Sequence, residues 1–356
     1  MNTIKIGNRI IGEGQRPYFI ADIGANHDGD INRAFMLIEK AKEAGADVAK
    51  FQNFKANKIV SNKGFSSLSG QLSHQASWKK PVVEVYKDAS ISYDWTEKIK
   101  QKCNEVGIEY CTSPYDFESV DRVDPYLRLY KIGSGDITWL EIIKYIAKKR
   151  KPVMIATGAS SMKDVVRAMN TLKQYSEDIV LMQCNTNYSG STENFKHLNL
   201  NVLKTYHQSF PKIILGLSDH TSGHAAVLGA IALGATVIEK HFTDDNNRIG
   251  PDHKFAMNPK TWRDMVNRSY ELYYALGDGV KRVEENEKQT VIVQRRSLRY
   301  VNDITKGDIV KKEDIFPLRP VTENGFAPYE ENKIIGKIVK RDVKNDDPVL
   351  QNDFEI

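Results

Sequence analysis

Two histidines in this sequence end short apolar runs in the same way. Residues 213–220 (IILGLSDH) finish at His220, and residues 237–241 (VIEKH) finish at His241. Between them, residues 223–234 are small and aliphatic, as expected for a helix, so the stretch has a strand–helix–strand pattern. If the two strands are parallel neighbours, both imidazoles point into one crevice, where they could hold a divalent metal ion.

Other polar residues follow apolar runs at the same phase along the chain. They are Asp22, Lys50, Gln52, Ser113, Lys131, Ser134, Asp136, Thr157, Tyr188 and Ser218. Strand ends are generally more polar than strand middles, which explains any one of these residues. It explains poorly why two lysines, two acids and two histidines recur at equivalent places.

The elements that would position these residues alternate regularly. Helical patterns cover residues 32–45 and 94–106, with Gly107 as a stop signal, and further helical segments follow later strands. Eight β-runs are expected at residues 18–23, 48–53, 108–112, 129–132, 152–157, 179–184, 213–218 and 237–241. This inventory predicts a TIM (β/α)8 barrel, whose active site lies at the carboxyl ends of its strands. A doubly wound open sheet is the alternative, but no GxGxxG follows the first strand.

Two departures from the alternation indicate domain organisation. Residues 54–92 are expected to be a long loop, and its size suggests a lid or insertion. The alternation ends near residues 277–279 (GDG), so we expect a catalytic domain at 1–280. Residues 281–296 are highly charged and predict a linker or exposed helix, and residues 297–356 predict a small β-rich domain.

Composition narrows the class of protein. The 356 residues are 40% hydrophobic and 27% charged, which is ordinary globular composition. A net charge of +5 is too weak to indicate nucleic acid binding but suits a small anionic substrate. We expect no membrane span and no signal peptide, hence a cytoplasmic protein. Cys103, Cys111 and Cys184 form no CxxC pair and are expected to be free thiols.

Taken together, several motifs resemble the sialic acid synthases, a family with a TIM barrel followed by an antifreeze-like (SAF) domain. The barrel motifs are residues 21–27 (ADIGANH), 49–52 (AKFQ), 131–136 (KIGSGD), 156–158 (ATG), 216–220 (GLSDH), 239–243 (EKHFT) and 250–252 (GPD). The SAF pattern is seen in residues 304–308, 318–320 and 335–337. The resemblance covers essentially the whole chain, and the order of the motifs makes it specific.

The resemblance implies a transferase that condenses phosphoenolpyruvate with an N-acylated amino sugar. The acceptor would be N-acetylmannosamine or a 2,4-diacetamido-trideoxyhexose, and the products a nonulosonic acid and phosphate. A divalent metal, Mn²⁺ or Mg²⁺, would be held by His220 and His241 and would polarise the sugar aldehyde. A ligand with a phosphate and a carboxylate needs cations and hydroxyl donors, and family positions matching Lys50 and Lys131 supply the cations.

The remaining roles also follow from the resemblance. Ser113, Ser134 and Ser218 would help to bind phosphoenolpyruvate, and Asn26, Gln52, Tyr188 and Asp252 would contact the sugar. Arg319 would reach the active site of a partner subunit, which implies a domain-swapped homodimer. Asp22 and Asp136 would act near the sugar, one taking a proton from the attacking water and the other orienting hydroxyl groups or metal-bound water.

The sequence departs from the common pattern on the substrate side. Aspartate replaces glutamate at Asp22 and Asp136, Ala156 replaces a serine, and Thr186 replaces an asparagine. These changes suggest an acceptor other than N-acetylmannosamine. Two alternatives stay open: a catalytically silent sugar- or phosphate-binding barrel, and a Schiff-base aldolase that uses a barrel lysine as nucleophile.

Overall fold

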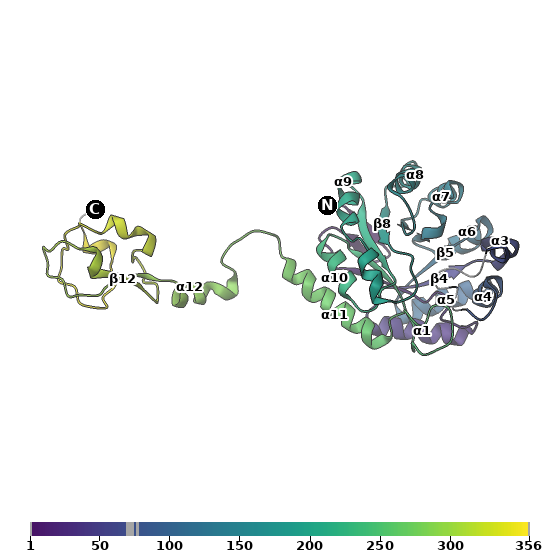
Figure 1. Cartoon of the computed structure of the whole chain (residues 1–356), viewed down its shortest axis with the longest axis horizontal. Coiled ribbons are helices and arrows are strands. Elements are labelled where there is room, and N and C mark those ends of the chain that lie inside the picture. Colours follow the sequence, from purple (N-terminus) through teal and green to yellow (C-terminus); the bar gives the residue numbers. More distant parts are fainter. Residues whose placement is uncertain (1, 69–74, 76–77, 355–356) are drawn as a thin grey trace. The chain divides into compact units, whose positions relative to one another are not determined.

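The computed structural model describes residues 2–68, 75 and 78–354. The chain divides into two compact units, Met1–Gly277 and Asp278–Ile356, which we call the barrel unit and the C-terminal unit (Figure 1). The barrel unit contains an eight-stranded sheet in the order β5-β4-β3-β10-β9-β8-β7-β6. The strands are β3 (Tyr18–Asp22), β4 (Val48–Asn53), β5 (Glu109–Pro114), β6 (Tyr130–Ile132), β7 (Val153–Ala156), β8 (Ile179–Cys184), β9 (Ile214–Asp219) and β10 (Val237–His241).

Every ladder within this sheet is parallel, as the βα alternation requires. The first and last strands of the order, β5 and β6, also contact each other, so the sheet is a nearly closed barrel. The prediction of a TIM barrel is therefore confirmed, with all eight predicted strands in place.

Helices surround the strands in Figure 1. They are α1 (Ile31–Ala44), α5 (Asp94–Val106), α6 (Phe117–Val123), α7 (Leu140–Ala147), α8 (Met162–Lys173), α9 (Val202–Ser209), α10 (Ala225–Ala232) and α11 (Pro259–Leu276). Their ends follow local sequence signals. The Asp30 side chain caps the start of α1, and Gly45, with a φ of 99°, ends it. Gly107 ends α5 in the same left-handed conformation, as predicted.

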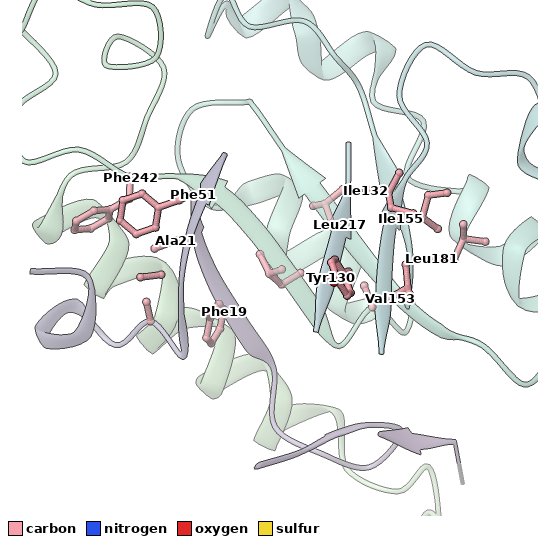
Figure 2. Close-up of a cluster of buried hydrophobic side chains, with 14 of the residues drawn as sticks. Phe19, Ala21, Phe51, Tyr130, Ile132, Val153, Ile155, Leu181, Leu217 and Phe242 are labelled. Atoms are coloured by element: carbon pink, nitrogen blue, oxygen red, sulfur yellow. The ribbon is translucent and has the colours of Figure 1, made fainter. Parts of the chain in front are cut away.

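The strands place alternate residues on the two faces of the sheet, because side chains alternate along a strand. Residues such as Phe19, Ala21 and Ile155 pack outward against the helices (Figure 2). Their neighbours Ile20 and Met154 belong to a second cluster inside the barrel. Most of the predicted polar residues at the strand ends therefore continue the inner face. Thr157 is the exception: it follows the outward-facing Ile155, and its hydroxyl lies 2.9 Å from the Tyr206 hydroxyl of α9.

A hairpin that the sequence did not reveal packs at the amino-terminal end of the barrel. It consists of β1 (Thr3–Ile6) and β2 (Arg9–Gly12), paired antiparallel. Ile4, Ile6 and Ile11 join the inner cluster there and cover this end of the barrel. The open end is therefore the opposite one, formed by the carboxyl ends of the strands.

The segment predicted as a long loop is largely helical where it is described. It contains α2 (Ala56–Ile59), α3 (Asn62–Ser67) and α4 (Val82–Ala89), whereas residues 69–74 and 76–77 lie outside the described residues. The prediction of a loop was wrong for these parts because such short helices carry too few turns to show a clear apolar period.

The C-terminal unit has its own core of Leu298, Tyr300, Val310, Val349 and other apolar side chains. Strands β11 (Ser297–Tyr300) and β12 (Ile315–Leu318) pair antiparallel, and isolated bridges join other segments. The charged stretch before this core contains the short helix α12 (Lys288–Gln294). Among the described residues, no helix is both long and apolar enough to cross a bilayer.

Candidate active site

A cavity of about 340 Å³ opens at the carboxyl ends of the barrel strands. Twelve of the predicted site residues line it: Asp22, Lys50, Gln52, Ser113, Lys131, Ser134, Asp136, Tyr188, Ser218, His220, His241 and Asp252. They come from seven strand ends and from the loop after β10. The parallel barrel thus brings together residues that are as far as 230 positions apart, Asp22 and Asp252 (252 − 22).

At the base of the cavity lies a compact group of charges that we call the charged floor: Asp22, Lys50, Lys131, Ser218 and Glu239. The Lys50 ammonium pairs with Asp22, and it lies 3.8 Å from Oε1 of Glu239. That same Oε1 accepts a hydrogen bond from Lys131 Nζ at 2.8 Å and another from Ser218 Oγ at 3.1 Å. All five side chains are buried, so these contacts act in a medium that screens them weakly.

The pKa values of the charged floor follow from these contacts. Burial alone would raise the pKa of Asp22, but the Lys50 ammonium and His241 outweigh it and hold that pKa at about 2. Glu239 is likewise buried, and Lys131 and Lys50 lower its pKa. Burial favours the neutral amine of Lys50, yet Asp22 and Glu239 outweigh burial and raise its pKa. These contacts therefore favour the charged ammonium form of the buried Lys50.

The two predicted metal-binding histidines lie beside this floor. The centroids of the His220 and His241 rings are 5.5 Å apart. Nδ1 of His220 lies 2.9 Å from the carbonyl oxygen of Asn185, and because a carbonyl only accepts, this nitrogen carries the proton. Nε2 is then the nitrogen with a free lone pair. Burial, followed by the neighbouring His241, lowers the pKa of His220 to about 3, so its ring stays neutral.

His241 has a buried ring nitrogen that could accept a ligand. Its Nδ1 is buried without a hydrogen-bond partner among the described residues and lies 3.6 Å from an oxygen of Asp252, while its Nε2 lies 3.6 Å from Asp22. A buried imidazole nitrogen without a hydrogen-bond partner can coordinate a metal ion, and nearby carboxylates attract a cation. In the described part of the chain, no group of three or more His, Cys, Asp or Glu side chains is arranged to hold a metal. Two imidazoles would thus leave other positions to water or substrate.

A buried ion pair supports the loop that carries His220. Asp219 and Lys240, on the outer faces of β9 and β10, pair with each other below the loop. Asp219 also accepts from the backbone and hydroxyl of Thr221, and Lys240 Nζ donates to the Thr221 carbonyl at 2.6 Å. This network fixes the residues on both sides of His220.

Asp136 differs from the other acids of the site. It follows β6 in a short turn, and burial raises its pKa to about 6. Its electrostatic neighbours include Tyr115 and Tyr86, which line the same cavity. A carboxyl group with a pKa near 6 can exchange a proton near neutral pH, whereas Asp22 at about 2 is a weak base.

Besides Thr157, two predicted residues are not among those that line the cavity. Asn26 is fully buried, and its amide donates to the carbonyl of Phe242 at 2.9 Å, which ties the loop after β3 to the end of β10. Arg319 belongs to the C-terminal unit, where it directly follows β12 and is exposed. Neither placement tests the substrate contacts that the resemblance implies.

The sequence reasoning missed Glu239, although it quoted the motif that contains it. The signal was present, because Glu239 stands two positions before His241 in β10 and must share its face of the sheet. It also missed Phe54, Trp78, Tyr86 and Tyr115, which line the cavity. Most of these lie in the stretch expected to be a loop, where no period indicated their direction.

Comparison with known proteins adds to this geometry. Residues 37–281 match the NeuB family, and residues 295–355 match the SAF domain. The chain is 35% identical to an N,N'-diacetyllegionaminic acid synthase of Campylobacter jejuni, over 95% of this chain and 100% of that one. A pseudaminic acid synthase of the same organism is 31% identical, over 99% of this chain and 100% of that enzyme.

A solved structure is similar as well. The N-acetylneuraminic acid synthetase of Leptospira borgpetersenii superposes with a TM-score of 0.71 at 25% identity. The match covers 81% of this chain and 95% of that one.

Proposed function

The chain belongs to the NeuB family, and from this we propose that it condenses phosphoenolpyruvate with an N-acylated amino sugar. In the reaction, C3 of phosphoenolpyruvate forms a bond to the aldehyde carbon of the open-chain sugar. Water adds at C2, and the C2–O bond to the phosphoryl group then breaks. The products are a nonulosonic acid and inorganic phosphate. The synthases named above are relatives of this chain, and their names supply the product class.

The observation that carries the proposal is the pair of buried lysines in the charged floor. Lys50 and Lys131 converge on one oxygen of Glu239, at 3.8 and 2.8 Å. Phosphoenolpyruvate carries both a phosphate and a carboxylate, so it needs more than one cation within a few ångströms. The hydroxyls of Ser113 and Ser134 line the same cavity and would add donors.

The two acids that the sequence could not separate have different environments, which supports different roles. Asp136, with a pKa of about 6, would take the proton from the water that adds at C2. Asp22 stays ionised and pairs with Lys50, so it would orient the sugar and hold the lysine in place. Replacing Asp136 with asparagine should remove the limb of the pH–rate profile near pH 6.

A divalent cation, Mn²⁺ or Mg²⁺, would be held by His220 and His241. When bound, it supplies Lewis-acid polarisation of the acceptor's aldehyde. The buried, unpartnered Nδ1 of His241 and the neutral His220 ring support this role. The two carboxylates within 3.6 Å of His241 would also attract a cation.

The environment of Lys50 argues against a Schiff-base aldolase that uses this lysine as its nucleophile. Such an enzyme needs a neutral amine, usually obtained by lowering the pKa of a lysine. Lys50 has the opposite shift, because Asp22 and Glu239 hold its proton. Borohydride trapping with substrate would reveal a Schiff base and would overturn this conclusion.

The acceptor and the assembly complete the proposal. The acceptor would be N-acetylmannosamine or a 2,4-diacetamido-trideoxyhexose, in keeping with the product class that the relatives' names state. Arg319 would contact the acceptor's acyl group from a partner subunit in a domain-swapped homodimer. Arg319→Ala should then raise the KM for the sugar and leave the KM for phosphoenolpyruvate unchanged.

The test is release of inorganic phosphate from phosphoenolpyruvate, measured with Mn²⁺ over a panel of amino sugars. Release that requires one of these sugars and is abolished by EDTA is the expected result. Release that survives EDTA would remove the metal from the proposal. If metal-loaded protein released no phosphate with any sugar of the panel, the silent binding protein would be favoured.

A further inference from the structure

Two loops meet beside His241 at the carboxyl end of the barrel. One follows β3 and covers residues 23–30, and the other follows β10 and covers residues 242–258. A bridge between Phe242 and Met257 closes the second loop at its base. Residues 243–256, all of them described, form no helix or strand, so other contacts must fix those that line the cavity.

The second loop carries Asp252 into the cavity. Its carboxylate accepts a hydrogen bond from the Ala25 amide at 3.1 Å and lies 3.6 Å from Nδ1 of His241. The two loops approach so closely that a Cβ on Gly24 would lie 2.7 Å from this carboxylate. Gly24 also has a φ of 48°, so both the space and the backbone favour glycine there. One hydrogen bond stabilises a loop only modestly, so a fixed position for Asp252 needs further support.

That support comes from the next residue, His253. Its ring is fully buried, and both of its nitrogens are paired. Nε2 lies 2.9 Å from Oδ1 of Asp28, and Nδ1 lies 2.7 Å from the hydroxyl of Thr243. Since a carboxylate only accepts, Nε2 donates to Asp28. The two contacts fix the orientation of the ring and, with it, the backbone that carries Asp252.

Asp28 joins the two loops through three side chains. Its second oxygen accepts from Nε and Nη2 of Arg248 at 2.9 and 2.7 Å, and it lies 3.0 Å from Nε of Arg33. Burial alone would raise the pKa of Asp28, but the hydrogen bonds from His253 and Arg248 outweigh burial and lower it, so the carboxylate is charged. Arg33, in α1, also pairs with Asp244 at the start of the second loop. We call Asp28, Arg33, Arg248 and His253 the loop clamp.

We propose, on the basis of the function proposed above, that Asp28 and His253 are positioning residues for the acceptor: they hold Asp252 beside His241, where its carboxylate can bind sugar hydroxyl groups. In the described part of the chain, none of the four clamp residues lines the cavity, so the clamp acts through Asp252. The lysines of the charged floor lie on β4 and β6, which carry no clamp residue. Loss of the clamp should therefore impair use of the amino sugar and spare phosphoenolpyruvate.

Substitutions of Asp28 and His253 test the clamp. Asp28→Asn removes the charge, and asparagine tolerates the φ of 51° that Asp28 adopts. His253→Ala removes the paired ring. With Mn²⁺ and the amino sugar of the panel that supports phosphate release, each variant should raise the KM for that sugar by about 10-fold and leave the KM for phosphoenolpyruvate unchanged. His253→Gln keeps an N–H donor that can reach Asp28 and should restore part of the loss.

Asp30→Ala is the matched control. Asp30 lies in the same loop as Asp28 and caps α1, so its loss should lower stability without changing either KM. Hydrogen–deuterium exchange adds a readout that needs no turnover. Peptides covering residues 244–256 should exchange faster in Asp28→Asn and His253→Ala than in the wild-type protein and in Asp30→Ala.

The two measurements separate this inference from the proposed function. Faster exchange in both clamp variants of a protein that releases no phosphate with any sugar would overturn the synthase and retain the hold on Asp252. Phosphate release together with unchanged exchange in both variants would overturn the clamp and retain the synthase. An equal rise in the KM for both substrates would also overturn the clamp, because a general loss of structure would explain it.

Discussion

Replacing Glu239 with glutamine tests the charged floor directly. The substitution keeps the size of the side chain and an oxygen that can accept from Lys131 and Ser218, but it removes the negative charge between two lysines. Lys131 would keep a hydrogen bond and lose its ionic partner. The site as a whole would become more positive by one charge.

The magnitude follows from the distances. At an effective dielectric constant of about 20, a unit charge at 2.8 Å attracts with about 6 kcal/mol and one at 3.8 Å with about 4 kcal/mol. The burial of the Glu239 carboxylate offsets much of this attraction. Breaking a buried pair by removing one partner costs about 3–5 kcal/mol, and because glutamine keeps the hydrogen bonds we expect about 3 kcal/mol.

Urea unfolding followed by tryptophan fluorescence measures the effect, because all four tryptophans lie in the barrel unit. Glu118→Gln is the matched control. Glu118 pairs with Lys55 at 2.8 Å and Arg122 at 3.0 Å, but its side chain is 43% exposed, so solvent screens both pairs and the loss of its charge should cost much less than the loss of the Glu239 charge. Each carboxylate faces two cations, and burial is the main difference between the two sites.

A second test measures how much added phosphate stabilises each protein. Glu239 competes with an anionic ligand for the two lysines, so phosphate should stabilise Glu239→Gln more than it stabilises the wild-type protein. The reasoning is refuted if Glu239→Gln costs no more than Glu118→Gln. It is equally refuted if phosphate stabilises the variant less than the wild type.

Two further predictions concern buried charges. Lys240→Met leaves Asp219 buried without its counter-ion and should lower the free energy of unfolding by about 3–5 kcal/mol. Adding Asp219→Asn should restore part of the loss, and urea unfolding of the single and double variants checks this. The pKa of Asp136 is raised from 3.8 to about 6, so the native state holds this proton more tightly than the unfolded chain and stability falls as pH rises through that range. Asp136→Asn should therefore stabilise the protein by about 1–3 kcal/mol at pH 8 but not at pH 3.5, and unchanged relative stability between these pH values would contradict the assignment.

The sequence by itself determined the barrel and most of the residues in its cavity. Strand runs with a polar residue at the carboxyl end recur eight times, and parallel strands in a closed barrel must bring those ends together. His220, His241, Lys50 and Lys131 could be placed in one site for this reason. These placements depended only on the position of each residue within its own strand.

Only the tertiary structure decided how these residues pair. That Glu239 bridges Lys131 and Lys50 depends on which strand ends face each other across the barrel. That Asp22 rather than Asp136 neutralises Lys50 depends on the register in which β3 pairs with β4. The different pKa values of Asp22 and Asp136 follow from those neighbours and from burial, which no pattern along the chain encodes. The ring contacts of Phe54 with Tyr86 and Tyr115 have the same origin, because residues that follow β4 and β5 meet a residue of α4 only when the segment after β4 folds back onto the barrel.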